Sequence, residues 1–200
     1  MSFNYKPSKY ILTRVKLFAD ERLEGSENLY RLRGESKAEK MRIDLITGAL
    51  GEYAVYNYFK SLGLKCSRPD LKIYNTRKKS YDADLKAENF SGEKVDVHVK
   101  SQTKASVKRY NQSWLFQRKD KLVSDPRIDE IMVFTNVCEK TWGVSIVGFV
   151  HPRLVSRFGL WGECKVPFYQ KTKVAIYLED LIPYGIVQDN FYQELEVFGV

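Results

Sequence analysis

Polar side chains alternate with valines over residues 95–102, which is the pattern of a β-strand with one buried face. Three valines share one face of this strand, and the other face carries Asp96, His98, Lys100 and Gln102. Aspartate and histidine can bind a metal ion, and a lysine ammonium attracts a phosphate oxygen. The polar face therefore has the group types that metal-assisted hydrolysis of a phosphodiester requires.

Two further carboxylates lie just upstream, in Tyr81–Leu85. This segment is predicted to form the partner strand, with Asp82 and Asp84 on one face and a hairpin turn at residues 89–92. Such a hairpin would place both carboxylates beside the polar face of residues 95–102. We therefore expect the chemically active groups to meet on the surface of an antiparallel strand pair.

Glu52 is a carboxylate on the apolar face of a helix predicted over residues 36–62. It lies three residues before Val55 and seven before Phe59, so it shares their inward face. A carboxylate on such a face needs a cation, a metal ion or a hydrogen-bond donor. Two interpretations stay open: Glu52 contributes to the site on the hairpin, or it reaches solvent or a lysine at the edge of the apolar stripe.

These placements resemble the PD-(D/E)xK nuclease superfamily, which has the restriction-endonuclease-like fold. Its members have a glutamate on a core helix and an aspartate on the first strand of a hairpin. The second strand carries an acidic residue, any residue and a lysine. The matching positions are Glu52, Asp84, His98 and Lys100, with Gln102 two residues further on. The likeness covers roughly residues 44–150, and His98 in place of the acid makes the motif an HxK variant.

The resemblance implies a divalent-metal-dependent DNA endonuclease of a restriction-like, phage or mobile-element type. It implies Mg²⁺ or Mn²⁺ as cofactor, held by Asp84, Glu52, His98 and the carbonyl of Val99. Lys100 would orient or help to deprotonate the attacking water, and Gln102 would position the lysine or contact the scissile phosphate. The implied partner is DNA, which we expect to be double-stranded, and a homodimer is one assembly that the resemblance allows.

His98 keeps several alternatives open. A neutral imidazole suits Mg²⁺ less well than an oxygen ligand does, so Asp82 or Asp96 could supply the missing oxygen. Otherwise the chain is a catalytically inactive nucleic-acid-binding module on the same fold. A branched-DNA (Holliday junction) resolvase and a basic protein-interaction domain are the remaining hypotheses. Asp70, in a literal Pro-Asp pair, competes with Asp84 for the aspartate position, and we favour Asp84.

Positive charge is concentrated around the predicted hairpin. The chain carries a formal net charge of +8, with basic clusters over residues 60–79 and 100–121 and no lysine or arginine after Lys173. A basic surface of this kind favours a polyanionic partner. We expect phosphate contacts from a polar loop directly after the hairpin and from the earlier cluster, at Lys104, Lys108, Arg109, Tyr110, Lys78 and Lys79.

The apolar pattern predicts a mixed α/β fold with a central sheet flanked by helices, which the resemblance refines to a restriction-endonuclease-like core. We expect a helical extension over residues 1–35 and an α/β domain over residues 36–200. Helices are predicted over 8–24, ending at the glycine-containing segment 25–28, and from an N-cap at Ser36 to Leu62, where Gly63 ends the helix. Further strands are predicted at 114–116, 128–137, 143–150 and 173–177, with a short helix at 154–158 and a turn or helix at 178–182.

The remaining signals concern compartment and structural side chains. Three cysteines form no metal-binding or paired pattern, which favours reduced thiols. No apolar run approaches the ~20 residues of a membrane span, and no apolar signal region opens the chain, so we expect a cytoplasmic protein without membrane contact. Trp114 is expected to belong to the core, and His151 to be structural or incidental.

Overall fold

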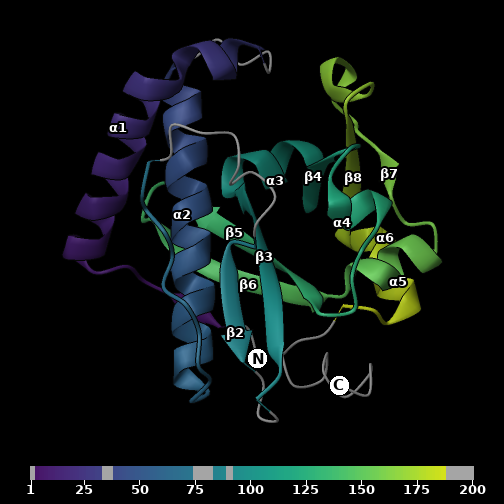
Figure 1. Ribbon diagram of the computed structural model, residues 1–200. Helices are drawn as coiled ribbons and strands as arrows, with labels where there is room; N and C mark the ends of the chain where they lie inside the picture. The colour runs from purple at the N-terminus through teal and green to yellow at the C-terminus, as the bar shows by residue number, and fades with distance from the viewer. Residues whose placement is uncertain (1–2, 33–37, 74–82, 89–91, 188–200) are drawn as a thin grey trace.

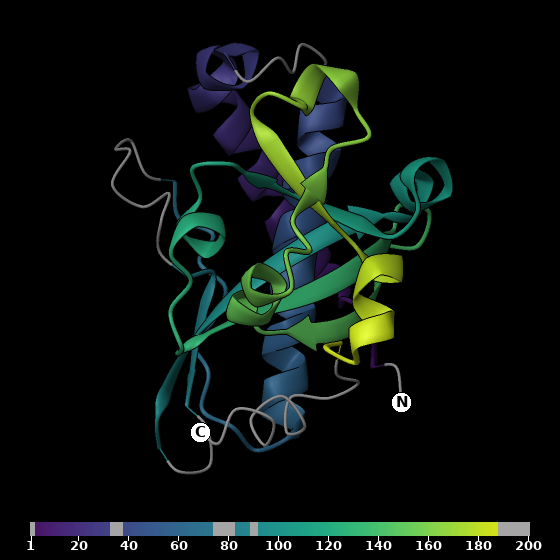
Figure 2. The same ribbon diagram turned by 90° about the vertical axis from the view of Figure 1, so that its right-hand side faces the viewer.

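The computed structural model describes residues 3–32, 38–73, 83–88 and 92–187, with side chains in all of these ranges except at residues 25–32 (Figure 1). A five-stranded sheet occupies the centre of the described part. Helices α1 (Lys9–Leu32) and α2 (Ala38–Ser61) cover one face. A three-stranded sheet with several short helices covers the other face, as Figures 1 and 2 show from two sides.

The other elements follow in chain order. The strands are β1 (Asn4–Tyr5), β2 (Leu85–Glu88), β3 (Lys94–Thr103), β4 (Ser113–Gln117), β5 (Glu130–Cys138), β6 (Gly143–Val150), β7 (Gly162–Glu163) and β8 (Lys173–Tyr177). The helices are α3 (Lys104–Tyr110), α4 (Lys121–Ser124), α5 (Pro152–Arg157) and α6 (Leu178–Leu181), with 3₁₀ turns η2 (Pro167–Tyr169) and η3 (Ile182–Tyr184).

The central sheet is mixed. Its strand order is β1-β6-β5-β3-β2, and β3 is antiparallel to β2 but parallel to β5. The second sheet has the order β4-β8-β7 and is antiparallel throughout. The predicted α/β class, with a mixed central sheet flanked by helices, is therefore confirmed, and the restriction-endonuclease-like core stays a prediction.

The alternation of side chains along β3 is as predicted. Its three valines are buried in one apolar cluster together with Val55 and Phe59 of α2. Since alternate residues of a strand face opposite sides, the polar side chains of β3 point away from α2 and toward the second sheet. On that side Trp114 of β4 stacks on Phe134 of β5, with ring centroids 4.1 Å apart, so Trp114 is a core residue as expected.

Helix α2 crosses β3 unusually closely at Gly51. A Cβ atom at that position would lie 2.0 Å from the Ser101 hydroxyl and 2.9 Å from the Thr135 hydroxyl, which is closer than van der Waals contact allows. Only glycine can occupy this crossing without a shift of the helix. The helix ends at Ser61, and Gly63 follows with a φ of +78°, in agreement with the predicted glycine stop.

Two predictions about helices were wrong. Helix α1 continues through residues 25–28 to Leu32, because a glycine costs a helix only about 1 kcal/mol and α1 is anchored on α2 by Val15, Phe18 and Ala19. The predicted polar loop at 104–110 is helix α3. Thr103 caps this helix, since its hydroxyl accepts a hydrogen bond from the Ser106 N–H at 3.1 Å.

The first strand of the hairpin begins later than predicted. β2 starts at Leu85, so Asp84 immediately precedes the strand instead of lying within it. Tyr81, Asp82 and most of the predicted turn lie outside the described residues, and so does the proposed cap Ser36. Gly92, the last residue of the turn, has a φ of +83°. The antiparallel pairing itself is as predicted, and its register places Leu85 opposite Val97.

The remaining strand predictions agree with β4, β5, β6 and β8, and the two short helices form at α5 and α6. The N-terminal segment contributes more than a helix, because β1 adds an edge strand to the central sheet beside β6. His151 is structural, as expected: its Nδ1 accepts from the Arg153 N–H at the start of α5, at 3.1 Å. All three cysteines are free thiols. No helix in the described ranges has both the length and the apolar character needed to cross a membrane.

Candidate active site at the β2–β3 hairpin

Asp84 lies where the pairing between β2 and β3 ends. Its Oδ2 accepts a hydrogen bond from the backbone N–H of Val99 at 2.7 Å, so the carboxylate takes the place that a strand carbonyl would otherwise occupy. The other carboxylate oxygen has no hydrogen-bond partner among the described residues. Asp84 is therefore fixed in position by one oxygen and can offer the other to a ligand.

His98 lies between two carboxylates on the polar face of the sheet. Glu130 opens β5 on one side of β3, and Asp84 precedes β2 on the other. The ring is 9% exposed, and its Nε2 lies 3.6 Å from Glu130 Oε1 without a hydrogen bond to a described residue. Burial lowers the pKa of His98 below its usual value, although Asp84 and Glu130 act in the opposite direction. The ring is consequently neutral at pH 7.

Glu130 is a buried carboxylate that the sequence interpretation missed. It is 5% exposed and is held by Arg127, whose N–H and Nε donate to its two oxygens at 2.8 and 3.1 Å. Arg127 in turn donates to Asp96 at 2.5 Å. The available signal was the position of an acid directly before the continuous apolar run of β5, where a charged side chain begins a fully buried strand.

The same network shows how Asp96, an alternative metal ligand predicted from the sequence, is bonded. Its carboxylate is paired with Arg127 and lies 3.9 Å from Lys86 Nζ. A carboxylate already neutralised by an arginine is a weaker metal ligand than one that is not. Asp96 is therefore better placed to hold Arg127 than to complete a metal shell.

Lys100 lies two residues beyond His98 on the same face. Its side chain is half-buried, and its Nζ lies over the ring of Phe116 in β4, 5.0 Å from the centroid. No carboxylate of the described residues forms an ion pair with it. The ammonium is therefore held in place by an aromatic ring and keeps its charge available for an anion.

Glu52 follows Gly51, the residue at which α2 crosses β3. The crossing lies at Ser101, which comes directly after Lys100 in the strand. It is half-buried, whereas its neighbours Gly51 and Tyr53 are buried. The predicted helix carboxylate thus lies at the level of the polar residues of β3, although it belongs to the helix on the other face of the sheet.

Gln102 is buried and bonded within the fold. Its Oε1 accepts from the Ser113 N–H at 3.0 Å, and its Nε2 donates to the Asn111 carbonyl at 2.9 Å. These bonds join the end of β3 to the start of β4. Gln102 therefore holds the second sheet against the hairpin, and its predicted contact with a phosphate would require these bonds to rearrange.

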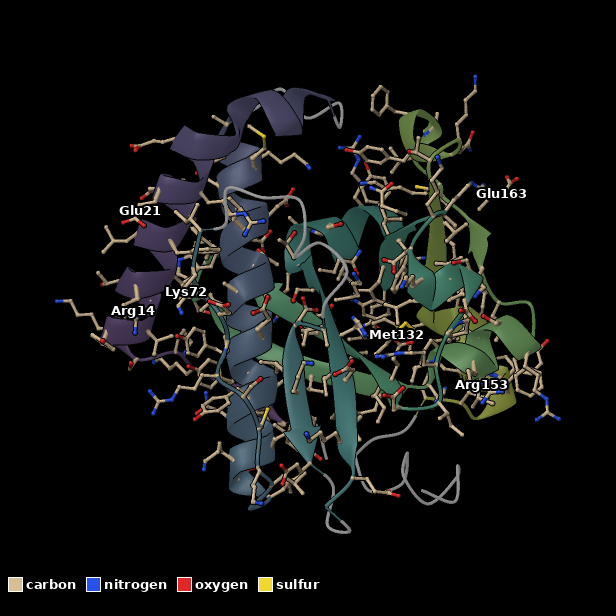
Figure 3. The ribbon with its side chains drawn as sticks, in the orientation of Figure 1. Arg14, Glu21, Lys72, Met132, Arg153 and Glu163 are labelled. Atoms are coloured by element: carbon tan, nitrogen blue, oxygen red, sulfur yellow. The ribbon has the colours of Figure 1, made fainter. Side chains whose placement is uncertain are left out.

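The competing aspartate, Asp70, lies in a different setting. Its Oδ1 accepts from the Lys72 N–H at 2.9 Å, and the neighbouring Leu71 packs on the α1–α2 cluster. Figure 3 shows Lys72 beside these helices, whereas Met132, the β5 partner of His98, lies between β3 and α4. Asp84, which is bonded to Val99, is thus the aspartate that contacts β3, the strand that carries Lys100.

Four of the six residues predicted to contact phosphate lie in the described part of the chain. Three basic side chains of α3 are exposed: Lys104, Lys108 and Arg109. Tyr110 is half-buried, and the Arg109 guanidinium lies 5.1 Å from the centroid of its ring. Lys78 and Lys79 lie outside the described residues. Helix α3 follows β3 directly, so its charges adjoin the end of the strand that carries Lys100.

The donor set fits a divalent ion in one particular way. Among the described side chains, no three of His, Cys, Asp or Glu are grouped closely enough to hold a metal ion. Mg²⁺ does not require such a cage, because it commonly binds one or two carboxylates and completes its shell with water and phosphate. Asp84 fits that requirement, because one oxygen is bonded to Val99 and the other has no partner among the described residues. His98 lies close enough to Asp84 for the two groups to interact electrostatically.

Comparison with known proteins adds no relative. No protein-family model matches the chain, and no curated protein or solved structure is significantly similar to it.

Proposed function

We propose that this protein is a divalent-metal-dependent DNA endonuclease with its active site at the open end of the β2–β3 pairing. The observation that supports the proposal most strongly is that Asp84 and Lys100 both lie close enough to His98 to interact with it electrostatically. Asp84 is anchored on the Val99 N–H, and Lys100 has no ion pair with a described residue. A fixed carboxylate beside an available ammonium is the arrangement that the PD-(D/E)xK resemblance implies.

In this proposal Asp84 and Glu52 hold the metal ion, and the Val99 carbonyl and His98 are further ligands. A bound Mg²⁺ or Mn²⁺ would polarise the phosphate and stabilise the charge that develops on it. Lys100 orients the attacking water or the phosphate through its ammonium group, and the Phe116 ring restricts where that ammonium can lie.

Glu130 acts through His98 as a positioning residue. A carboxylate next to Nε2 favours the tautomer with the proton on that nitrogen, which leaves Nδ1 with its lone pair. The neutral imidazole can then offer the Nδ1 lone pair as a metal ligand on the Asp84 side of the strand. This pairing offers a physical reason for a histidine at the position where the resembling superfamily has an acid.

The exposed basic residues of α3 are proposed to bind the DNA backbone. Lys104, Lys108 and Arg109 lie on one short helix that begins where β3 ends. Contacts of this kind position a nucleic acid without reading its sequence. They are consistent with double-stranded DNA as the substrate, and they leave sequence preference to other parts of the surface.

A cleavage assay tests the proposal. Purified wild-type protein would be incubated with Mg²⁺ or Mn²⁺ and supercoiled, linear, single-stranded or four-way-junction DNA. Asp84→Asn and Lys100→Ala are each expected to lower the rate by about 10²-fold or more, because each removes a charge that acts on the reacting phosphate. Lys86→Ala is the matched control, since Lys86 is an exposed lysine on the same face of the same hairpin.

The outcomes separate the hypotheses. Cleavage that survives in Lys86→Ala and is lost in the other two variants supports the site. Cleavage that is equal in all four proteins contradicts it. A clear preference for the junction would identify a branched-DNA resolvase within the same proposal.

Two observations favour a second candidate, a catalytically inactive nucleic-acid-binding module on the same fold. The described residues provide no three-ligand metal group, and His98 stands where an acidic ligand is expected. This candidate predicts DNA binding in the presence of a chelator and no cleavage with any divalent ion. Binding that is equally strong with and without metal, on all substrates left intact, would favour it over the endonuclease.

A further inference from the structure

The tip of the second sheet combines positive charge with an exposed aromatic ring. We define the tip as residues 117–119, at the end of β4, and residues 165–173, between β7 and β8. In Figure 1 residues 165–173 stand at the upper right, in light green, apart from α1 and α2. These two segments contain five basic residues and no acidic one: Arg118, Lys119, Lys165, Lys171 and Lys173.

Phe168 is the most exposed phenylalanine of the described residues, with 68% of its surface accessible. The turn that carries it is firmly held. The Arg118 guanidinium donates twice to the Gln170 carbonyl, at 2.9 and 3.2 Å, and the Arg118 N–H donates to the Thr172 carbonyl at 2.9 Å. The Phe168 ring also makes an edge contact with Tyr169, with centroids 5.4 Å apart. The ring is therefore presented on an ordered turn, so its binding would cost little conformational entropy.

The lysines of the tip differ in what they contact. Lys165 is paired with Glu179 at 3.3 Å, and Lys173 lies over the Tyr169 ring at 3.8 Å. Lys119 and Lys171 are exposed and form no ion pair with a described residue. These two side chains leave positive charge on the same tip as the exposed Phe168 ring.

We infer that the tip binds nucleic acid, with an unpaired base stacked on Phe168 and phosphates held by Lys119 and Lys171. Base stacking on an aromatic side chain next to positive charge is how single-stranded nucleic acid is bound without sequence preference. An anionic membrane would also attract the lysines, but stable attachment needs a broad apolar face, and one protruding ring buries little. As a statement about the nuclease substrate the inference rests on the proposed function, whereas as a binding site it stands alone.

The test measures binding of the full-length protein to a fluorescent oligothymidine and to a duplex of equal length, in EDTA so that cleavage does not contribute. Phe168→Ala is expected to weaken binding of the single strand by about 5-fold or more and to affect the duplex less. Phe158→Ala is the matched control, because Phe158 is 40% exposed directly after α5, where its ring packs on Tyr184. It is expected to leave both affinities within about 2-fold.

Rescue and a direct signal complete the experiment. Phe168→Trp should keep wild-type affinity, since indole also stacks on bases, and Lys119→Ala with Lys171→Ala should lower the salt dependence of binding. An oligonucleotide containing 2-aminopurine should show quenching with wild-type protein and less quenching with Phe168→Ala.

Three results would overturn the inference. One is that wild-type protein does not bind the single strand. Another is that Phe168→Ala binds it as tightly as Phe158→Ala does. The third is that Phe168→Ala leaves this affinity intact but abolishes binding to vesicles containing phosphatidylserine, which would assign the tip to a lipid surface. A failure of cleavage in the nuclease assay would leave these results unchanged, so the two proposals can fail separately.

Discussion

At the scale of single residues, the site is defined by how each carboxylate is already bonded. Asp96 is neutralised by Arg127, and Glu130 is held by the same arginine beside His98. Among the described residues, Asp84 is held by a backbone N–H alone, which fixes the side chain without neutralising its charge. The three carboxylates therefore differ in their availability, and of these three only Asp84 has no ion pair with a described residue.

An imidazole donor at position 98 should shift the metal preference of the site. Nitrogen ligands favour later first-row ions over Mg²⁺, whereas an amide oxygen does not. We expect His98→Asn to lower the Co²⁺-to-Mg²⁺ ratio of cleavage rates, and of affinities measured by titration calorimetry, by about 10-fold. Glu130→Gln keeps the imidazole and should keep the ratio. An unchanged ratio in His98→Asn would show that the ring does not contact the metal ion.

His151 should make stability depend on pH. Burial lowers the pKa of its imidazole, so the unfolded chain binds a proton more readily than the folded one, near the ordinary pKa of about 6.5. The free energy of unfolding should therefore fall as the pH drops below about 6.5, since protonation of Nδ1 also removes the cap of α5.

The measurement is denaturant unfolding at pH 7.5 and pH 5.5. His151→Asn retains a helix-capping side chain but does not titrate in this range. It is expected to lose less stability than wild type between the two pH values. An equal loss in the two proteins would contradict the assigned role of His151.

At the scale of elements, the close packing of α2 on the sheet depends on Gly51, which has no side chain. Gly51 touches the hydroxyls of Ser101 and Thr135, which themselves share a hydrogen bond of 2.8 Å. This contact fixes the position of Glu52 along β3. Glu52 therefore lies near Ser101, the strand residue that follows Lys100.

Gly51→Ala should be destabilising, in contrast to the usual effect of alanine in a helix. The added Cβ would lie 2.0 Å from Ser101 Oγ, and overpacking of this kind costs about 1–3 kcal/mol. Gly48→Ala is the control on the same helix, because nothing lies within 4 Å of its added Cβ, and it should stabilise by about 0.5–1 kcal/mol.

Chemical denaturation measures both changes. The double variant Gly51→Ala with Ser101→Ala should recover part of the loss, because the closest clashing atom is removed. Equal stabilities of the two single variants would contradict the close crossing.

At the scale of the whole molecule, two surfaces of positive charge adjoin the site region: α3 at the end of β3, and the tip of the second sheet. The formal net charge of +8 makes association with a polyanion sensitive to salt. Each phosphate contact that is lost should reduce the slope of log affinity against log salt by about 0.9 for duplex DNA.

Replacement of Lys104, Lys108 and Arg109 by alanine should therefore flatten that slope, without change in sequence preference. Arg153→Ala is the control, because Arg153 is an exposed arginine on α5, which Figure 3 shows at the far side from α1. Duplex binding measured by anisotropy at several salt concentrations gives both slopes. A triple variant with the wild-type slope would exclude α3 from the DNA path.

The sequence by itself determined the elements whose signal is local. The strict alternation of β3, the apolar run of β5 and the glycine after α2 depend on side-chain periodicity and backbone preference, so the mixed α/β class followed from them. It also placed Asp84, His98 and Lys100 in one hairpin, because antiparallel neighbours are set by short loops.

Only the tertiary structure decided which of the polar side chains near the site are already engaged in hydrogen bonds or ion pairs. Gln102 is bonded into the start of β4. Asp96 is paired with Arg127 and Glu130 stands beside His98, and both of these contacts join residues more than 30 positions apart. α1 runs through its glycine because packing on α2 outweighs a local preference. Burial and ion pairing depend on contacts between strands that are not neighbours in sequence, and no local pattern records them.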